Sequence, residues 1–316
     1  EVVFEGGNLI RLENGDIEGH DDLEVLTTSR NSIRHHFTTM NATSAATAFA
    51  AYFLAKLRDS YPNAWVETLR ALMIHSANWT SNMLSNRSLN ELRENEKRSL
   101  LRSVGYGVPN LEKALYSANN NLTLIAEREI QPYKKEDSRG KYNDYHLYQL
   151  PWPKEALEAL EATNVTLKIT LSYYIEPNPG SRRFATHYQY HSHQLDFEII
   201  KRNETLEVFK TRISKPDDED NDSQVQRTGE TWLLGRPSIK GSIRKDMLIL
   251  TGREMAERNI IAIYPKNGWY KNLKRQNKFN EKIRYSLVVS IETEAQNIDL
   301  YSPVFSEVRV SVKSNE

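Results

Sequence analysis

Ser44 is the residue whose type and surroundings offer the clearest chemistry in this chain. It stands in the stretch Phe37-Thr38-Thr39-Met40-Asn41-Ala42-Thr43-Ser44-Ala45-Ala46-Thr47-Ala48, where small side chains crowd around a single serine. A serine at the point where a loop becomes a helix has its own backbone N–H and the helix dipole directed toward a developing oxyanion. Small neighbours also let a substrate backbone approach closely. The alternative interpretation is that Thr43 or Ser44 only caps a core helix.

Three histidines of equal parity, His187, His191 and His193, form a second candidate site. On one strand they would project to the same face, and three imidazoles can hold a transition metal. The surrounding segment has no recognised metal-ligand spacing. Polar residues on a solvated strand face are therefore the favoured interpretation, and we expect no metal site.

Two charged clusters could bind a ligand, but each is favoured to be an exposed surface segment. The acidic run Asp217-Asp218-Glu219-Asp220-Asn221-Asp222 carries oxygen ligands that Ca²⁺ would accept, but it lacks the EF-hand pattern, so a solvated loop is favoured. Aromatic and basic residues stand together at Trp269, Tyr270, Lys271, Lys274, Arg275 and Lys278. Such a mixture can bind nucleic acid, but a hairpin with an exposed basic tip is the favoured interpretation.

The first part of the chain, which contains Ser44, is predicted to be mainly helical. Residues 44–57 carry alanine and large apolar side chains on nearly all faces, which predicts a buried helix. After the break at Tyr61-Pro62, a second helix is expected from Val66 to Ile74 with Asn63 as its cap. Further helices are predicted at 89–101 and 111–116.

Strand patterns replace helical ones after Asn119-Asn120-Asn121. Alternating or apolar segments predict strands at 122–125, 165–175, 194–200, 260–263, 285–291 and 307–312. Many strands with few helices indicate a β-sandwich. We therefore expect an α/β domain over residues 1–120, a linker over 121–142 that includes the charged stretch Lys134 to Tyr142, and an all-β sandwich domain over 143–316.

Composition excludes several classes of function. Basic and acidic residues number 42 each in 316 residues, so no net field favours nucleic acid or an anionic membrane, and we expect neither as a partner. The chain has no cysteine, which excludes disulfides and thiolate sites and fits a reducing compartment, so the cytoplasm is favoured. No apolar run approaches the roughly 20 residues that span a bilayer. The start, Glu1-Val2-Val3-Phe4, has no signal-peptide pattern and is typical of the middle of a buried strand, so we expect residues before Glu1.

The segment around Ser44 resembles the serine segment of the subtilase family, in which Gly-Thr-Ser is followed by small residues and a buried helix. Three flanking segments are similar to that family too: Glu1 to Asn8, Arg70 to Ala77 and Gly105-Tyr106-Gly107-Val108-Pro109. The later part of the chain resembles a β domain appended in a bacterial branch of the family. The similarity there lies at Leu150-Pro151-Trp152-Pro153, residues 170–177, residues 264–269 and Arg284-Tyr285-Ser286.

Two residues depart from the family pattern. Ala42 stands where the family usually has glycine, and Ala48 where many members have proline. If position 42 requires a positive φ, the Cβ of Ala42 costs about 1 kcal/mol or more. If only close approach is required, Ala42 narrows the substrate cleft instead.

The resemblance implies a serine endopeptidase that hydrolyses peptide bonds through an acyl-enzyme on Ser44, with Asn41, Ala42 and Thr43 in the cleft and oxyanion region and no cofactor. In this family the triad runs Asp, His, Ser along the chain. The Asp, the His and the oxyanion-hole Asn are therefore expected before Glu1, in the amino-terminal half of the same protease. No catalytic role is expected for His20, His35, His36 or His75, and the chain alone is expected to be inactive.

Protein or peptide substrates are the partners that the resemblance implies, and an intracellular bacterial protease of this kind would work with an ATPase partner protein. The competing hypothesis is a degenerate subtilase that acts as a non-catalytic binding or scaffold module. Ala42 is the residue that favours it.

Overall fold

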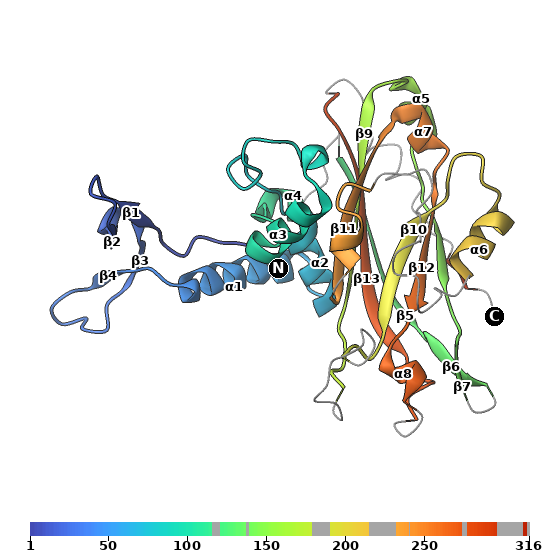
Figure 1. Ribbon diagram of the computed structural model, residues 1–316, viewed down its shortest axis with the longest axis horizontal. Coiled ribbons are helices and arrows are strands. Elements are labelled where there is room, and N and C mark those ends of the chain that lie inside the picture. Colours follow the sequence, from blue (N-terminus) through green and yellow to red (C-terminus); the bar gives the residue numbers. More distant parts are fainter. Residues whose placement is uncertain are drawn as a thin grey trace.

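Mixed α/β structure is present throughout the described protein (Figure 1). The structure is a computed structural model that describes residues 1–115, 121–136, 139–178, 190–214, 232–239, 241–273, 277–295 and 312–314. Two small hairpins lie at one end, a group of helices lies in the middle, and two larger sheets lie at the other end. None of the helices in these ranges is long and apolar enough to cross a membrane.

Two four-stranded antiparallel sheets form the larger end of the molecule. The first, called here the helix-facing sheet, has the order β11-β9-β13-β5, with bounds Ile243–Thr251, Asn164–Tyr173, Ile283–Thr293 and Asn121–Ile130. The second, called here the far sheet, has the order β10-β12-β8-β14, with bounds Gln194–Ile199, Ile260–Lys266, His146–Gln149 and Val312–Ser314. In the helix-facing sheet β13 is antiparallel to both neighbours, with Tyr285 opposite Tyr173 of β9 and Ile283 opposite Ile130 of β5.

Alternation along the strands explains why these sheets pack together. In β9, side chains at odd positions from Val165 to Tyr173 join the apolar core that the two sheets share, and Leu287 and Val289 of β13 join it as well. A side-chain period of two sends the intervening residues to the opposite face. There Thr170, Ser172, Ser286 and Ser290 are buried although they are polar, because helices cover that face.

Short helices connect the strands. They are α5 (Lys154–Ala159), α6 (Leu206–Ser214), α7 (Gly252–Ala256) and α8 (Trp269–Asn272), with the hairpin β6–β7 (Tyr133–Glu136, Arg139–Tyr142) beside α8. Residues 121–142, expected as a linker, thus contain two strands of this hairpin and the strand β5, which pairs with β13 along its length. The linker expectation was wrong for this segment because its apolar residues at alternate positions, such as Leu122 and Leu124, face the shared core.

The first part of the chain supplies the helices α1 (Thr43–Ser60), α2 (Val66–Ser76), α3 (Glu94–Val104) and α4 (Leu111–Leu115). Helix α2 lies on the outer face of the helix-facing sheet, against β9 and β13. Nine of its residues are buried, so α2 forms an extensive packing contact between the helices and the helix-facing sheet. Its cap is Trp65, with no side-chain bond, instead of the expected Asn63.

Two sequence-based expectations about burial were wrong. Helix α1 is largely exposed, with only Ala45, Phe53 and Leu57 buried, because among the described elements it packs mainly along one edge, against α2 and α4. Val2 to Phe4 are half-buried, but the segment Glu1 to Phe4 is not a strand inside a sheet. Its backbone pairs instead with the glycine turn, through Tyr106 N to Glu1 O at 2.8 Å and Val3 N to Gly107 O at 3.0 Å.

Two hairpins project from the start of α1 and are called here the hairpin arm, residues 8–40. The first pairs β1 (Leu9–Arg11) with β2 (Ile17–Gly19), and the second pairs β3 (Val25–Thr28) with β4 (Phe37–Met40). Figure 1 shows the arm extending away from the sheets. Strand β4 leads directly into Asn41 and α1, so the arm and Ser44 share one short connection.

Candidate active site around Ser44

Residues 41–44, called here the serine loop, are held against the turn Gly6-Gly7-Asn8. Ala42 N donates to Gly6 O at 2.8 Å, and Asn41 Nδ2 donates to Asn8 O at 2.9 Å. Gly7 has φ +92°, and a Cβ there would lie 2.9 Å from Asn41 Cα. Glycine is therefore required at this position both for its conformation and for the close approach of the two loops.

Ala42 has an extended backbone, with φ −161° and ψ 150°. Any residue adopts this conformation, so the Cβ of Ala42 causes no backbone strain. Of the two expectations for this position, the one based on a positive φ is wrong. The other expectation, a narrower substrate cleft, stays a prediction, and Ala42 itself is half-buried with its backbone against Gly6.

Ser44 is the second residue of α1 and is exposed, as is Thr43. The first N–H groups of a helix have no partner within the helix, and Ala42 provides no side-chain cap for them. The exposed end of α1 therefore combines a hydroxyl with N–H donors and the positive end of the helix dipole. This arrangement is suited to stabilising negative charge on a group attached to the Ser44 oxygen.

Residues 1–107 match the family model of the subtilases, peptidase family S8. This part of the chain is a subtilisin-like serine protease region. No curated protein and no solved structure matches the chain. The match covers the turn at residues 6–8, the serine loop, α1, α2 and the glycine turn at 105–107, and we call these residues the subtilase region below.

Within the described part of the subtilase region, no histidine forms a hydrogen bond with Ser44. His75 is buried in α2, where its ring bonds to Thr170 Oγ1 at 2.9 Å and to Ser290 Oγ at 2.8 Å. Burial, followed by the positive charge of Lys168 and Lys245, holds the pKa of His75 well below its usual 6.5. His75 is thus a neutral structural residue that links α2 to the helix-facing sheet.

The other candidate groups lie only partly within the described residues. His193 is buried beside Tyr173 and Tyr270, and burial lowers its pKa to about 3. His187 lies outside the described residues, and no cluster of metal-ligating side chains occurs within the described ranges. The acidic run 217–222 also lies outside them.

Trp269 and Tyr270 are buried in α8, whereas the expectation of an exposed basic tip concerned the lysines and arginine that follow them. Trp269 Nε1 donates to Glu176 O at 3.0 Å, and Tyr270 Oη donates to the Glu176 carboxylate at 2.7 Å. Lys278 pairs with the same carboxylate. The aromatic residues fix α8 against the segment after β9, and Lys274 and Arg275 lie outside the described residues.

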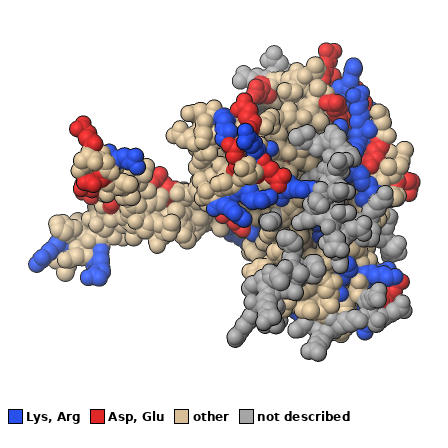
Figure 2. Space-filling view, in the orientation of Figure 1, with Lys and Arg blue, Asp and Glu red and all other residues tan. Residues whose placement is uncertain are grey.

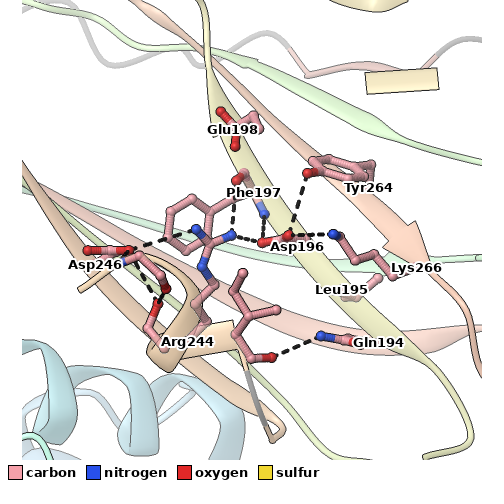
Figure 3. A network of polar contacts seen from close by, with 12 residues as sticks. Gln194, Leu195, Asp196, Phe197, Glu198, Arg244, Asp246, Tyr264 and Lys266 are labelled. Carbon is pink, nitrogen blue, oxygen red and sulfur yellow. Dashed lines mark hydrogen bonds and ion pairs between the residues drawn. The ribbon is translucent and has the colours of Figure 1, made fainter. Parts of the chain in front are cut away.

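Sequence analysis missed a buried ionic network between the two sheets (Figure 3). Asp196 of β10 contacts Arg244 of β11, and its other oxygen lies 3.3 Å from Lys266 Nζ and 3.5 Å from Tyr264 Oη, both of β12. Asp246 accepts hydrogen bonds from Leu234 N at 2.8 Å and Gly235 N at 2.9 Å. Burial raises the pKa of Asp246 and lowers that of Arg244. The signal in the sequence was Arg244-Lys245-Asp246, three consecutive charges inside an apolar strand.

Polar contacts also join the subtilase region to the helix-facing sheet. Lys245 Nζ donates to Ile74 O at 3.0 Å and to Ala77 O, at the carboxyl end of α2. At the other end of α2, the Glu127 carboxylate accepts from Trp65 N at 2.6 Å and from the Thr68 hydroxyl. Side chains of β11 and β5 thus form hydrogen bonds at both ends of α2, a helix of the subtilase region.

Proposed function

We propose that this chain is the serine-bearing part of a subtilase-type serine endopeptidase, with Ser44 as the nucleophile. The observation that carries the proposal is the family match over residues 1–107 together with Ser44 at the exposed first turn of α1. In this reaction the Ser44 oxygen bonds to the scissile carbonyl carbon while its proton passes to a base. The base then protonates the leaving amine, the C–N bond breaks, and water hydrolyses the acyl-enzyme.

The serine loop would stabilise the intermediate. The Ser44 N–H and the dipole of α1 would face the oxyanion, and Asn41, Ala42 and Thr43 would line the cleft. The hydrogen bonds of Ala42 to Gly6 and of Asn41 to Asn8 support this assignment, because they keep the loop in one conformation. Such fixed donors are effective because they do not need to reorganise during the reaction.

The base, its carboxylate and the oxyanion-hole Asn would come from the amino-terminal half of the same protease. Helix α1 supports this proposal, because Phe49 and Tyr52 are 42% and 59% exposed on it. A helix with apolar side chains on most faces is typical of a protein interior. We propose that the amino-terminal half covers this face and brings its catalytic residues to Ser44.

The sheets after residue 121 would act as a β-sandwich domain that positions the subtilase region. Their shared core and the contacts of α2 with β9 and β13 support this role. An ATPase partner protein and a cytoplasmic bacterial setting belong to the same proposal. The scaffold hypothesis no longer draws support from strain at Ala42, because the backbone there is extended, and a substrate cleft narrowed by Ala42 is the support that it keeps.

A fluorophosphonate probe tests the proposal. The chain alone should scarcely react, whereas a protease extended amino-terminally through its Asp, His and Asn should be labelled at Ser44. Ser44→Ala should abolish labelling and peptide hydrolysis, and Thr47→Ala on the next turn of α1 should retain both. A folded extended protease that resists labelling would favour the scaffold hypothesis.

A further inference from the structure

Charge is segregated around Ser44 although the whole chain is neutral. From Val25 through Arg58 the sequence contains no aspartate or glutamate, and it carries Arg30, Arg34, Lys56 and Arg58. Residues 9–24 before it are mostly acidic instead, with Glu13, Asp16, Glu18, Asp21, Asp22 and Glu24 against one basic residue, Arg11. In Figure 2 the β1–β2 hairpin carries red side chains together with some blue, whereas Lys and Arg side chains lie at the free end of the β3–β4 hairpin.

The tip of the β3–β4 hairpin presents apolar side chains beside its arginines. Ile33 is 94% exposed and lies between Arg30 and Arg34, which are also exposed. On the strands, Thr28 pairs with Phe37 and Leu26 with Thr39, so Leu26 and Phe37 share one face of the hairpin. They are 68% and 63% exposed. Cationic and apolar groups together form a surface that we call the hairpin patch.

Hydrogen bonds hold this patch in a defined conformation and connect it to the serine loop. Ser29 N donates to His36 O at 3.0 Å, and Arg34 N donates to Asn31 O at 3.1 Å. Strand β4 runs from the tip to Met40, and Asn41 follows at once. A polypeptide held at the tip would have to extend along β4 to reach the exposed end of α1, where Ser44 is located.

We propose that the hairpin patch selects polypeptide substrates with an acidic segment that also contains an apolar residue. Arg30 and Arg34 would pair with its carboxylates, and Ile33, Leu26 and Phe37 would contact the apolar side chain. Exposed carboxylates near Ser44 would repel such a segment, and residues 25–58 contain none. A carboxylate that contacts this hairpin from outside that range is Asp21, which accepts from Thr39 Oγ1 at 3.3 Å. The role in substrate selection rests on the proposed protease function, but binding of a peptide to the patch is measured independently of cleavage.

Fluorescence anisotropy on the 316-residue chain tests the binding step. The probes are two fluorescein-labelled 12-residue peptides, one with Glu and Asp around a leucine and one with Lys at the same positions. The acidic peptide should bind more tightly, and its affinity should fall between 0.1 and 1 M salt, where the Debye length shortens from about 10 Å to about 3 Å. Arg30→Glu with Arg34→Glu should weaken its binding by about tenfold, and Ile33→Ser should weaken it less without removing the charge preference.

The matched control is Lys134→Glu with Lys135→Glu, which makes the same charge change on exposed residues of β6 at the far end of the molecule. It should leave the affinity within about twofold. Equal affinity for the two peptides, or loss of affinity in the control as large as in the arginine variant, would overturn the proposal. Tighter binding of a 12-nucleotide oligothymidine at the same patch would overturn it too, since the surface would then be a nucleic-acid site.

Turnover separates this inference from the proposed function. In the amino-terminally extended protease, substrates with acidic flanks should show higher kcat/KM, and the arginine variant should lose that preference while still cleaving neutral peptides. Cleavage without any charge preference would refute the inference and leave the protease assignment intact. Acidic-peptide binding by a protein that cleaves nothing would support the patch and count against the protease assignment.

Discussion

At the scale of single residues, Ala42 shows that a residue that differs from the family pattern must be judged from its backbone conformation. The residue occupies a glycine position, yet its φ is −161° and it initiates α1. It leaves the helix without a side-chain cap. Position 42 therefore bears on the free energy of the helix end, and its effect on the space available to a substrate stays a prediction.

The missing cap gives a direct prediction for stability. Ala42→Ser should raise the free energy of unfolding of the chain by about 1 kcal/mol, because a serine at this position can accept from an unpaired N–H of the first turn. Urea unfolding measures the change. Ala42→Val adds bulk without an acceptor and should give no gain. Equal stabilisation by both variants would show that packing, and not capping, limits stability at this site.

His75 gives a pH-dependent prediction. Its pKa is well below 6.5 in the folded protein, so the unfolded chain binds the proton more readily as the pH falls below 6.5. The contribution of neutral His75 to stability is therefore complete above pH 6.5 and is lost below it, by at most about 1.4 kcal/mol per pH unit. In urea unfolding at pH 7.5, 6.0 and 5.0, the stability difference between the native chain and His75→Gln should shrink as the pH falls. A constant difference would mean that His75 does not titrate on unfolding.

At the scale of elements, α2 is the helix that decides how the subtilase region is held. Its carboxyl end is capped by Lys245 of β11, and its amino end by Glu127 of β5. Burial lowers the pKa of Lys245 well below 10.5. The cost of burying this amine is offset by its bonds to Ala77 O and to Ile74 O, which also accepts from Ala77 N at 3.2 Å.

Removal of the Lys245 amine should therefore destabilise the protein. Lys245→Met keeps most of the buried volume but leaves Ile74 O and Ala77 O without this donor, so the free energy of unfolding should fall by about 1–3 kcal/mol. Lys134→Met, on an exposed residue of β6, is the control and should change it by less than about 0.5 kcal/mol. Similar values for the two variants would contradict the capping role.

At the scale of the whole molecule, the subtilase region and the two sheets share buried surfaces. One face of the helix-facing sheet packs on the far sheet, and the other packs on α2. Ile74 and Leu100 of the helices lie in the same apolar cluster as Ile243 and Met247 of β11. The boundary between the two parts is therefore an interior, not a surface between independent units.

This shared interior predicts cooperative unfolding. The far-ultraviolet circular dichroism and the exchange of α2 amides should report one transition, in which α2 loses protection together with β9 and β13. Hydrogen exchange across a urea series measures both. Early exchange of α2 with intact strands would show that the subtilase region unfolds separately. The hairpin arm and the first turn of α1 should exchange fastest, because few described residues pack on them.

The sequence alone determined the serine at a loop–helix junction, the family resemblance of the first hundred residues, the helices α1 to α4 and the strands β5, β9, β10, β12 and β13. These features follow from local spacing: the period of two in β9 and β13 and the apolar run of α1 are visible without any contact information. A local pattern shows that a side chain is apolar, but it does not show which element covers it. Tertiary structure therefore decided that α1 is exposed, that residues 121–130 complete a sheet, and that Ala42 is unstrained. It also decided the roles of His75 and Lys245, because their partners lie about 95 to 215 residues away in the chain, and only the fold brings such groups within hydrogen-bond distance.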